Sequence, residues 1–330
     1  MKRAAGAIAI ALAAAMLFAG GLVIWGNRTF ERPGPLTAET VLVVPRGAGL
    51  KAIAAQLETA GVIRHPLLFL AKAQWTGAHR ELKAGEYAFE AAISPAAVLA
   101  KLRRGDVVVR RVTVPEGLTS RQVAALIDAA PELDGALDAV PPEGSLLPET
   151  YDYRLGDSRA GLIERMMRAR DRLLDELWRG RAEGLPLSDP QAAVILASIV
   201  ERETAVPAER PRIAAVFINR LRRGMRLQSD PTVVYALTGG RGPLGRALSR
   251  RDLSIDHPYN TYAVGGLPPG PIANPGAASL AAVLRPDATK ELYFVADGTG
   301  GHAFAKTLRE HNRNVARWRR LQKKLRTDAK

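Results

Sequence analysis

Residues 195–204 read Ile-Leu-Ala-Ser-Ile-Val-Glu-Arg-Glu-Thr, an almost wholly apolar segment that ends in two carboxylates, Glu201 and Glu203. Pro190 suits the first turn of a helix, and Pro207 disfavours helical dihedrals in the residue before it. The pattern therefore predicts a helix that runs from Pro190 to the end of the quoted segment. Because its apolar residues fall on several faces, we expect this helix to be buried at the centre of its domain.

The two glutamates occupy different faces of this helix. Starting from Ala192, the positions i+4, i+7 and i+11 are Leu196, Ile199 and Glu203, so Glu203 extends an apolar stripe. Glu201 lies about 200° away around the helix. Burial raises the pKa of a carboxyl by up to ~3–5 units, and the negative end of the helix dipole acts in the same direction. A carboxyl kept protonated at neutral pH is suited to general acid catalysis. The alternative is an exposed last turn with Glu–Arg pairs.

The start of the chain has the pattern of a membrane anchor. Residues 4–25 carry no charge and reach about 33 Å as a helix, enough for a hydrocarbon core of ~30 Å. Lys2 and Arg3 precede this run and favour an orientation with the N-terminus in the cytoplasm. We therefore expect 1–27 to be a cytoplasmic stub and transmembrane anchor, and 28–39 to be a linker. A cleaved signal peptide is the alternative.

The composition limits the possible partners. The chain carries 47 Lys and Arg against 33 Asp and Glu, a net charge of +14, and contains no cysteine. Neither a disulfide framework nor a thiolate metal site can form without cysteine. No HExxH, P-loop or dinucleotide-binding pattern occurs, so we predict no metal and no cofactor. The basic charge favours anionic lipid or the carboxylates of cell-wall peptides over nucleic acid, which an outward-facing anchored chain rarely meets. A basic surface without a specific partner is the alternative.

A repeated pattern marks a small first domain. Residues 44–57 and 114–127 match at an offset of 70, and each contains a Pro-x-Gly turn before an amphipathic helix. The first copy resembles a LysM module, a peptidoglycan-binding fold that opens with a strand, a glycine turn and a helix. Any βα unit with a glycine turn is the alternative. We expect a LysM-like α+β domain over 40–140. Its strands are expected at 40–44, 85–89 and 107–114, and its helices at 66–75 and 94–103.

The remaining residues, 141–330, are expected to form a mixed α/β domain around the glutamate-bearing helix, so the fold class is α+β overall. Gly224 is placed to end a helix, because glycine adopts positive φ at little cost. A glycine-rich loop between two short apolar runs predicts a β-hairpin. The expected elements are helices at 158–176, 209–223 and 306–324, the last strongly basic, and hairpin strands at 292–296 and 302–305.

Polar and aromatic residues are available to complete a cleft beside this helix. Gln228 and Asp230 follow the predicted helix that contains Asn219. Tyr259 and Tyr262 supply rings suited to the faces of sugars. Taken singly, such tyrosines are more typical of core packing, so their role stays open at this point.

Long motifs carry a resemblance to one family. They are Leu-Pro-Glu-Thr-Tyr at 147–151, Ala-Ser-Ile-Val-Glu-Arg-Glu-Thr at 197–204, Val-Phe-Ile-Asn-Arg-Leu at 216–221, Gly-Met-Arg-Leu-Gln-Ser-Asp-Pro-Thr-Val at 224–233, Tyr-Asn-Thr-Tyr at 259–262, Gly-Leu-Pro-Pro-Gly-Pro-Ile at 266–272 and Val-Ala-Asp-Gly-x-Gly-Gly-His at 295–302. With these motifs most of the chain resembles the MltG (YceG-like) family, the endolytic murein transglycosylases of the bacterial inner membrane. Ser229 stands where threonine is expected and Glu149 where aspartate is common, and both keep the functional group.

The resemblance implies roles for individual residues. In that family the catalytic glutamate is the second acidic residue of the Glu-x-Glu-Thr motif, which is Glu203 here. Glu201, Asp230 and Gln228 are possible secondary acids or orienting groups. The candidates for substrate contact are Glu149, Tyr151, Asn219, Tyr259, Asn260, Tyr262 and His302.

The resemblance also implies the reaction. The family cleaves the MurNAc–GlcNAc β-1,4 bond inside nascent glycan without water, leaves 1,6-anhydroMurNAc ends and so terminates glycan elongation. The muramyl 6-hydroxyl is the nucleophile, so one carboxyl suffices, whereas hydrolytic glycosidases usually need two. A single-pass inner-membrane protein with a periplasmic catalytic domain is implied, as is association with peptidoglycan synthases. Two alternatives remain: a hydrolytic muramidase, with Asp230 or Glu149 as the partner of Glu203, and a non-catalytic peptidoglycan-binding scaffold.

Overall fold

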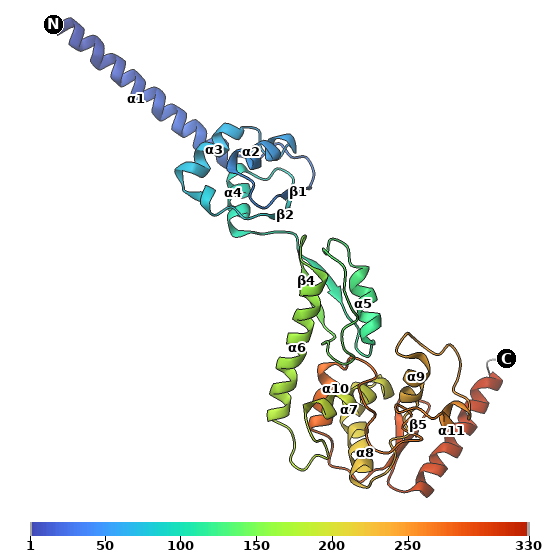
Figure 1. Cartoon of the computed structure of the whole chain (residues 1–330). Coiled ribbons are helices and arrows are strands. Elements are labelled where there is room, and N and C mark those ends of the chain that lie inside the picture. The colour runs from blue at the N-terminus through green and yellow to red at the C-terminus, as the bar shows by residue number, and fades with distance from the viewer. Residues whose placement is uncertain (1, 329–330) are drawn as a thin grey trace. The chain divides into compact units, whose positions relative to one another are not determined.

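The computed structural model describes residues 2–328 and shows a mixed α+β chain, as expected (Figure 1). Its contacts divide the chain into two compact units. The first ends at Arg110 and also takes in Arg154–Gly156, and the second consists of Arg111–Tyr153 and the chain from Asp157 onward. The expected boundary at 140–141 differs from this division, because the second copy of the repeated pattern belongs to the second unit.

The first unit begins with the long helix α1 (Lys2–Glu31). Within the described residues, Ile10–Glu31 is the one helical segment that is long and apolar enough to cross a membrane. The helix continues into the expected linker and ends at Glu31. Its last turn joins the folded part of the unit, since Phe30 is buried and its ring lies 6.2 Å from that of Phe69.

A two-stranded antiparallel sheet and three α-helices complete the first unit. Strand β1 (Thr40–Val44) pairs with β2 (Gly85–Phe89), so that Thr40 lies opposite Phe89 and Val44 opposite Gly85. These bounds are the ones that the sequence predicts. The helices are α2 (Leu50–Thr59), α3 (Pro66–Trp75) and α4 (Pro95–Arg104), with a short 3₁₀ turn, η1 (Ala78–Arg80). Their shared core includes Leu57, Phe69, Tyr87, Phe89 and Leu102.

Strand β3 (Arg110–Thr113) begins at the last residue of the first unit, and its other residues open the second unit, where β3 pairs with β4 (Thr150–Tyr153). Between them lies α5 (Ser120–Asp128). Thr119 caps this helix in a capping box with Gln122. The long helix α6 (Arg159–Arg179) follows β4 and is capped by Ser158.

Helix α7 (Pro190–Glu203) lies at the centre of the second unit's larger core. Asp189 caps it by accepting a hydrogen bond of 2.8 Å from the amide of Ala192. Every residue from Ala192 to Val200 is buried, because α6, α8 (Arg210–Arg222) and α10 (Ala277–Leu284) all pack against α7. The apolar residues of α7 thus contact neighbouring helices on several sides. Its two glutamates lie in its last turn, at the C-terminal end.

The second unit contains several further elements, of which α9 contacts α7. They are the 3₁₀ turns η2 (Pro207–Glu209) and η3 (Asp252–Ser254), α9 (Asp230–Thr238), the antiparallel hairpin of β5 (Tyr293–Ala296) and β6 (His302–Ala305), and α11 (Leu308–Asp328). The unit is therefore mainly helical with two small two-stranded sheets, rather than the mixed α/β domain that we expect from the sequence.

Removing the side chain of Leu196 tests the central position of α7. Leu196 is fully buried, so Leu196→Ala should lower the free energy of unfolding by about 2–5 kcal/mol. Leu308 is exposed on α11, and Leu308→Ala should change it by less than about 0.5 kcal/mol. Chemical denaturation of the full-length protein in detergent measures both. An equal effect of the two variants would contradict the central place of α7.

Candidate active site

Glu203 closes α7 and points toward the start of α9. Its Oε1 accepts a hydrogen bond of 2.5 Å from the hydroxyl of Ser229. The backbone amide of Ser229 is in turn held by the hydroxyl of Thr261 at 2.9 Å, so the donor to Glu203 is fixed by a second loop. Ser229 and Thr261 are buried, while the Glu203 side chain keeps some exposure.

Burial is the main reason that the pKa of Glu203 is raised to about 7. The Asp230 carboxylate raises it further, whereas the Ser229 hydrogen bond and the charges of His302 and Arg220 lower it. The pKa near 7 is thus a balance between burial and polar neighbours. A carboxyl with this pKa can give up and take back a proton near neutral pH.

Glu201, two residues earlier, is committed to structural interactions. Its side chain is only 4% exposed, and its Oε1 lies 3.0 Å from the guanidinium of Arg210 on α8. Its Oε2 accepts a hydrogen bond of 2.9 Å from the amide of Gly276, at the start of α10, where the helix dipole favours an anion. Arg210 also pairs with Glu116 at 2.9 Å. The two acids of α7 therefore have different surroundings, in agreement with their positions on different helix faces.

Asp230 and Tyr262 form a polar edge next to Glu203. The Tyr262 hydroxyl donates a hydrogen bond of 2.7 Å to Asp230 Oδ1, and burial raises the pKa of Tyr262. Gln228 precedes Ser229 with an exposed side chain and a positive φ of 52°. This left-handed backbone turns the chain so that Ser229 can face Glu203. The structure thus brings Tyr262, from a second loop, to Asp230 at the start of α9, and Gln228 contributes through its backbone.

Two other residues of the Tyr-Asn-Thr-Tyr motif are packed inside the unit. Asn260 is fully buried, and its amide donates to the carbonyls of Leu253 and Ile255 at 3.1 and 2.8 Å. The ring of Tyr259 lies 5.0 Å from that of Tyr235. The side chain of Asn260 thus holds the shape of its loop, and Tyr259 packs against Tyr235 of α9, while substrate contact by either residue stays a prediction.

His302 lies on β6 and is held by a carboxylate that the sequence did not reveal. Its Nδ1 is 2.7 Å from Glu209 Oε2, and its backbone amide donates to Glu209 Oε1 at 2.8 Å. Burial would raise the pKa of Glu209, but the bonds from His302 lower it overall. The hydroxyl of Thr204, directly after Glu203, also donates to Glu209. This pair connects the hairpin to the end of α7, and the charge of His302 acts on Glu203.

The remaining candidates take part in structural hydrogen bonds. The Asn219 amide donates to the carbonyls of Thr289 and Glu291 at 2.8 and 3.0 Å, which ties α8 to the loop before β5. Tyr151 donates to the carbonyl of Leu147 at 2.8 Å, and burial together with Glu149 raises its pKa to about 12. Glu149 is exposed beside it, at the start of β4. These contacts do not place any of the three at the Glu203 carboxyl.

Glu143 is a second carboxyl whose pKa is raised by burial. Its oxygens accept hydrogen bonds from the Ser120 amide at 2.7 Å and the Tyr235 hydroxyl at 3.2 Å. Those bonds join α5 to α9, so we interpret Glu143 as a structural acid. It is the competitor against which Glu203 has to be tested.

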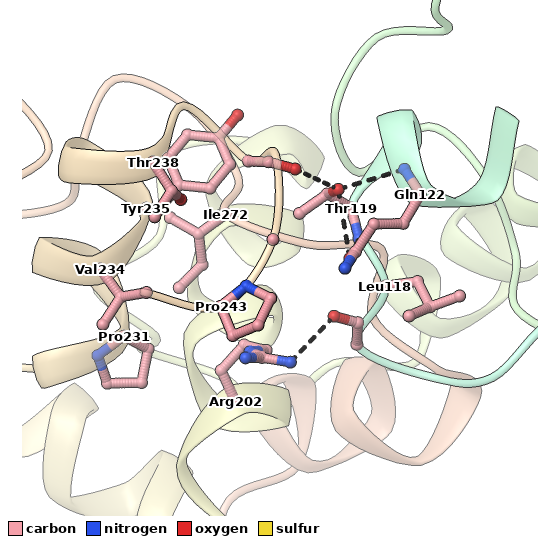
Figure 2. A pocket seen from close by; sticks show the side chains of 13 residues that line it. Leu118, Thr119, Gln122, Arg202, Pro231, Val234, Tyr235, Thr238, Pro243 and Ile272 are labelled. Carbon is pink, nitrogen blue, oxygen red and sulfur yellow. Dashed lines mark hydrogen bonds between the residues drawn. The ribbon is translucent and has the colours of Figure 1, made fainter. Parts of the chain in front are cut away.

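A cavity of about 220 Å³ lies beside this site, between α5, α7 and α9 (Figure 2). Thr119 approaches from one side and Tyr235 and Pro231 from the other, as Figure 2 shows. Arg202 reaches between them and donates a hydrogen bond of 3.3 Å to a backbone carbonyl of the opposite wall. Arg202 directly precedes Glu203, and Pro231 follows Asp230, so the cavity adjoins the end of α7. Among the described residues, no cluster of three or more His, Cys, Asp or Glu is arranged to hold a metal ion.

Three residues of this site escape prediction from the sequence. Glu209 lies 93 positions before His302 in the sequence. The residues around Glu209 do not indicate that its carboxylate pairs with that histidine. Arg220 is buried and donates to the carbonyls of Leu292 and Leu227 at 2.7 and 2.6 Å, although an arginine in an Arg-rich helix is usually exposed. Thr261 belongs to the Tyr-Asn-Thr-Tyr motif, and nothing in the order of those four residues indicates that the Thr261 side chain is buried.

Glu203 combines a pKa raised by burial to about 7 with a position at the end of a buried helix, which is the arrangement suited to an enzyme that uses general acid and base catalysis. Comparison with known proteins agrees with this class. A sequence model of the YceG-like family matches residues 42–317. The chain therefore belongs to the YceG-like family.

Several relatives support this assignment. An endolytic murein transglycosylase of Bacillus subtilis is 33% identical over 329 positions, which cover 90% of each chain. One of Streptococcus pneumoniae is 30% identical over 322 positions, which cover 83% of this chain and 57% of the relative. The crystal structure of a putative YceG-like protein from Listeria monocytogenes superposes with a TM-score of 0.51 at 32% identity, and covers 83% of this chain and 98% of that one.

Replacing Glu201 tests its structural role. Glu201→Gln leaves the buried Arg210 with only its contact to Glu116, so we expect the free energy of unfolding to fall by about 3 kcal/mol. Chemical denaturation measures the change, with the neighbouring exposed variant Arg202→Gln as control. A Glu201→Gln protein as stable as the wild type would show that this ion pair does not hold the end of α7.

Proposed function

We propose that this protein is an endolytic murein transglycosylase that uses Glu203 as its only catalytic carboxyl. The observation that carries the proposal is the raised pKa of Glu203, together with the commitment of Glu201 to Arg210. The names of the relatives from B. subtilis and S. pneumoniae support the reaction class. The proposed substrate is the MurNAc–GlcNAc β-1,4 bond inside a nascent glycan strand.

The protonated form of Glu203 begins the reaction. Its proton passes to the glycosidic oxygen as the bond from that oxygen to C1 of the muramyl residue breaks. The Glu203 carboxylate then accepts the proton of the muramyl 6-hydroxyl, whose oxygen bonds to C1 and closes the 1,6-anhydro ring. Glu203 ends in its starting protonation state, and no water is consumed. Ser229 stabilises the carboxylate form between the two steps.

A pKa near 7 suits this double role, because neither protonation state is strongly disfavoured at neutral pH. His302 and Arg220 limit the rise in the pKa of Glu203. We assign Tyr262 and Asp230, which form the polar edge beside Glu203, to contact with the sugar. The cavity that Arg202 enters is a suitable place for a neighbouring part of the strand.

The hydrolytic alternative has a specific basis in Asp230. This exposed carboxylate is close enough to Glu203 to raise its pKa, and inverting glycosidases use a second carboxylate to activate water. Its hydrogen bond from Tyr262 favours an orienting role instead. The chemical nature of the product ends distinguishes the two reactions.

We further propose that α1 anchors the protein in the inner membrane with the enzymatic unit in the periplasm. The apolar segment and the basic residues before it support this placement. Residues 40–140 would contain a LysM-like part that binds glycan, starting with β1 and α2. An enzyme that terminates glycan elongation has to act where strands are made, so peptidoglycan synthases are the expected partners.

Glu203→Gln tests the catalytic role. The amide keeps the shape of the side chain but cannot donate the proton, so release of 1,6-anhydromuropeptides should fall by about 10²–10⁴-fold. Mass spectrometry of muropeptides released from intact glycan measures this. Glu143→Gln is the matched control and should keep the activity, because Glu143 is a second carboxyl whose pKa burial raises but which lies in structural hydrogen bonds. Full activity of Glu203→Gln would overturn the proposal, and reducing ends in place of anhydro ends would favour the muramidase.

Two neighbouring substitutions should move the pH dependence in opposite directions. Activity requires protonated Glu203 in the free enzyme, so kcat/KM should fall as the pH rises through about 7. Ser229→Ala removes a bond that favours the carboxylate, so it should raise the pKa and move this fall to higher pH. Asp230→Asn removes a negative charge and should move it to lower pH. Shifts in the same direction would show that another group controls the profile.

A further inference from the structure

Helix α3 carries large apolar side chains on its outer face. Trp75 is 92% exposed and Leu67 is 79% exposed, and Ala71 between them is exposed as well. The spacing of four residues places all three on one stripe of the helix. Phe69 and Ala73, on the other side, are fully buried in the core of the first unit. A helix that is apolar on both sides is suited to a second apolar environment outside the unit.

This stripe adjoins the end of α1. The two helices line an apolar groove of about 360 Å³, to which α1 contributes Leu22 and Gly26, and α3 contributes Leu68 and Trp75. A Cβ on Gly26 would lie 3.4 Å from Leu68 Cδ1, so the helices are close at this point. Lys72 of α3 also donates a hydrogen bond to the side chain of Asn27 of α1. The depth of α3 is therefore fixed by the depth of α1.

A second cavity of about 250 Å³ lies further along α1 and has a different lining. It is lined by Arg32, Arg64 and His65, together with Trp25, whose ring lies 5.9 Å from that of His65. On average the α1 residues of this cavity come roughly 5 Å after those of the apolar groove, at 1.5 Å per residue. The polar layer on each side of a bilayer's hydrocarbon core is about 5–8 Å thick. The change from apolar to basic lining matches the change from acyl chains to headgroups.

We infer that α3 lies at the boundary between headgroups and acyl chains of the bilayer that holds α1, with Leu67 and Trp75 in contact with lipid. Arg32 and Arg64 then lie beside lipid phosphates. Tryptophan is enriched at this depth, and basic side chains next to it favour anionic lipid. The inference rests on the proposed membrane anchoring, and it adds that the first unit is held against the membrane by a second element besides α1.

The absence of cysteine makes a direct test possible, because every introduced cysteine is a unique labelling site. We would attach a spin label to Ala71→Cys in the full-length protein, reconstituted in vesicles of phosphatidylethanolamine and phosphatidylglycerol. Ala55→Cys, an exposed alanine on α2 that lines neither cavity, is the matched control. Leu17→Cys, in the middle of α1, reports on the anchor itself. Accessibility to oxygen, which concentrates in lipid, is compared with accessibility to a water-soluble nickel complex.

The inference predicts that the label at 71 is reached better by oxygen than by nickel, as at 17, whereas the label at 55 shows the reverse. A label at 71 that behaves like the one at 55, while 17 remains in lipid, would overturn the inference and leave the anchor intact. Low accessibility to both reagents at 71 would show a second copy of the chain on this face and would also overturn it. Nickel accessibility at 17 would refute the anchor and the inference together, without bearing on catalysis by Glu203.

Discussion

The ion pair between Arg210 and Glu201 is the interaction on which the site depends. The last turn of α7 contains two carboxylates only two residues apart, and they need different surroundings to have different roles. Arg210 and the amide of Gly276 hold Glu201 between α8 and α10. Because this side of α7 is fixed, the opposite side presents Glu203 to Ser229. The pair is nearly buried, so either charge alone would be costly there.

The groups around Glu203 act on its pKa in opposite directions. Burial and Asp230 favour the neutral acid, while Ser229, His302 and Arg220 favour the carboxylate. The result is a pKa of about 7, which suits the role that we propose for Glu203, first as an acid and then as a base. Glu209 holds the His302 side chain in position, and the carbonyl of Leu292, just before β5, holds the Arg220 side chain. The site therefore depends on segments that are far apart in the sequence.

Local signals in the sequence predict much of the fold. Pro190 at the start of α7, the continuous apolar residues of that helix, and the apolar runs of β1 and β2 are all short-range patterns, and the structure has these elements where they are expected. The helical stripe also indicates Glu203 rather than Glu201 as the acid in apolar surroundings. Helix α10 is buried on most sides, so its sequence shows no alternation of apolar and polar residues at helical spacing. Helix α9 contains β-branched residues, which are weak helix formers. Neither helix is predicted for these reasons.

Long-range pairs are the part that the sequence does not reveal. The amide of Asn260 has the right chemistry for a sugar, but its partners are backbone carbonyls of its own loop, which only the structure shows. Glu209 is found only through the fold, since the hairpin brings His302 to it. The division at Arg110 is likewise a property of contacts, and the repeated pattern at 114–127 suggests a later boundary.

The most direct test of the central claim is the pKa of the Glu203 carboxyl, measured by ¹³C NMR titration of glutamate-labelled protein and assigned with Glu203→Gln. The account predicts a midpoint near 7, well above the ordinary value of 4.5. A midpoint close to 4.5 would contradict it, because Glu203 would then be ionised at neutral pH and could not donate the first proton.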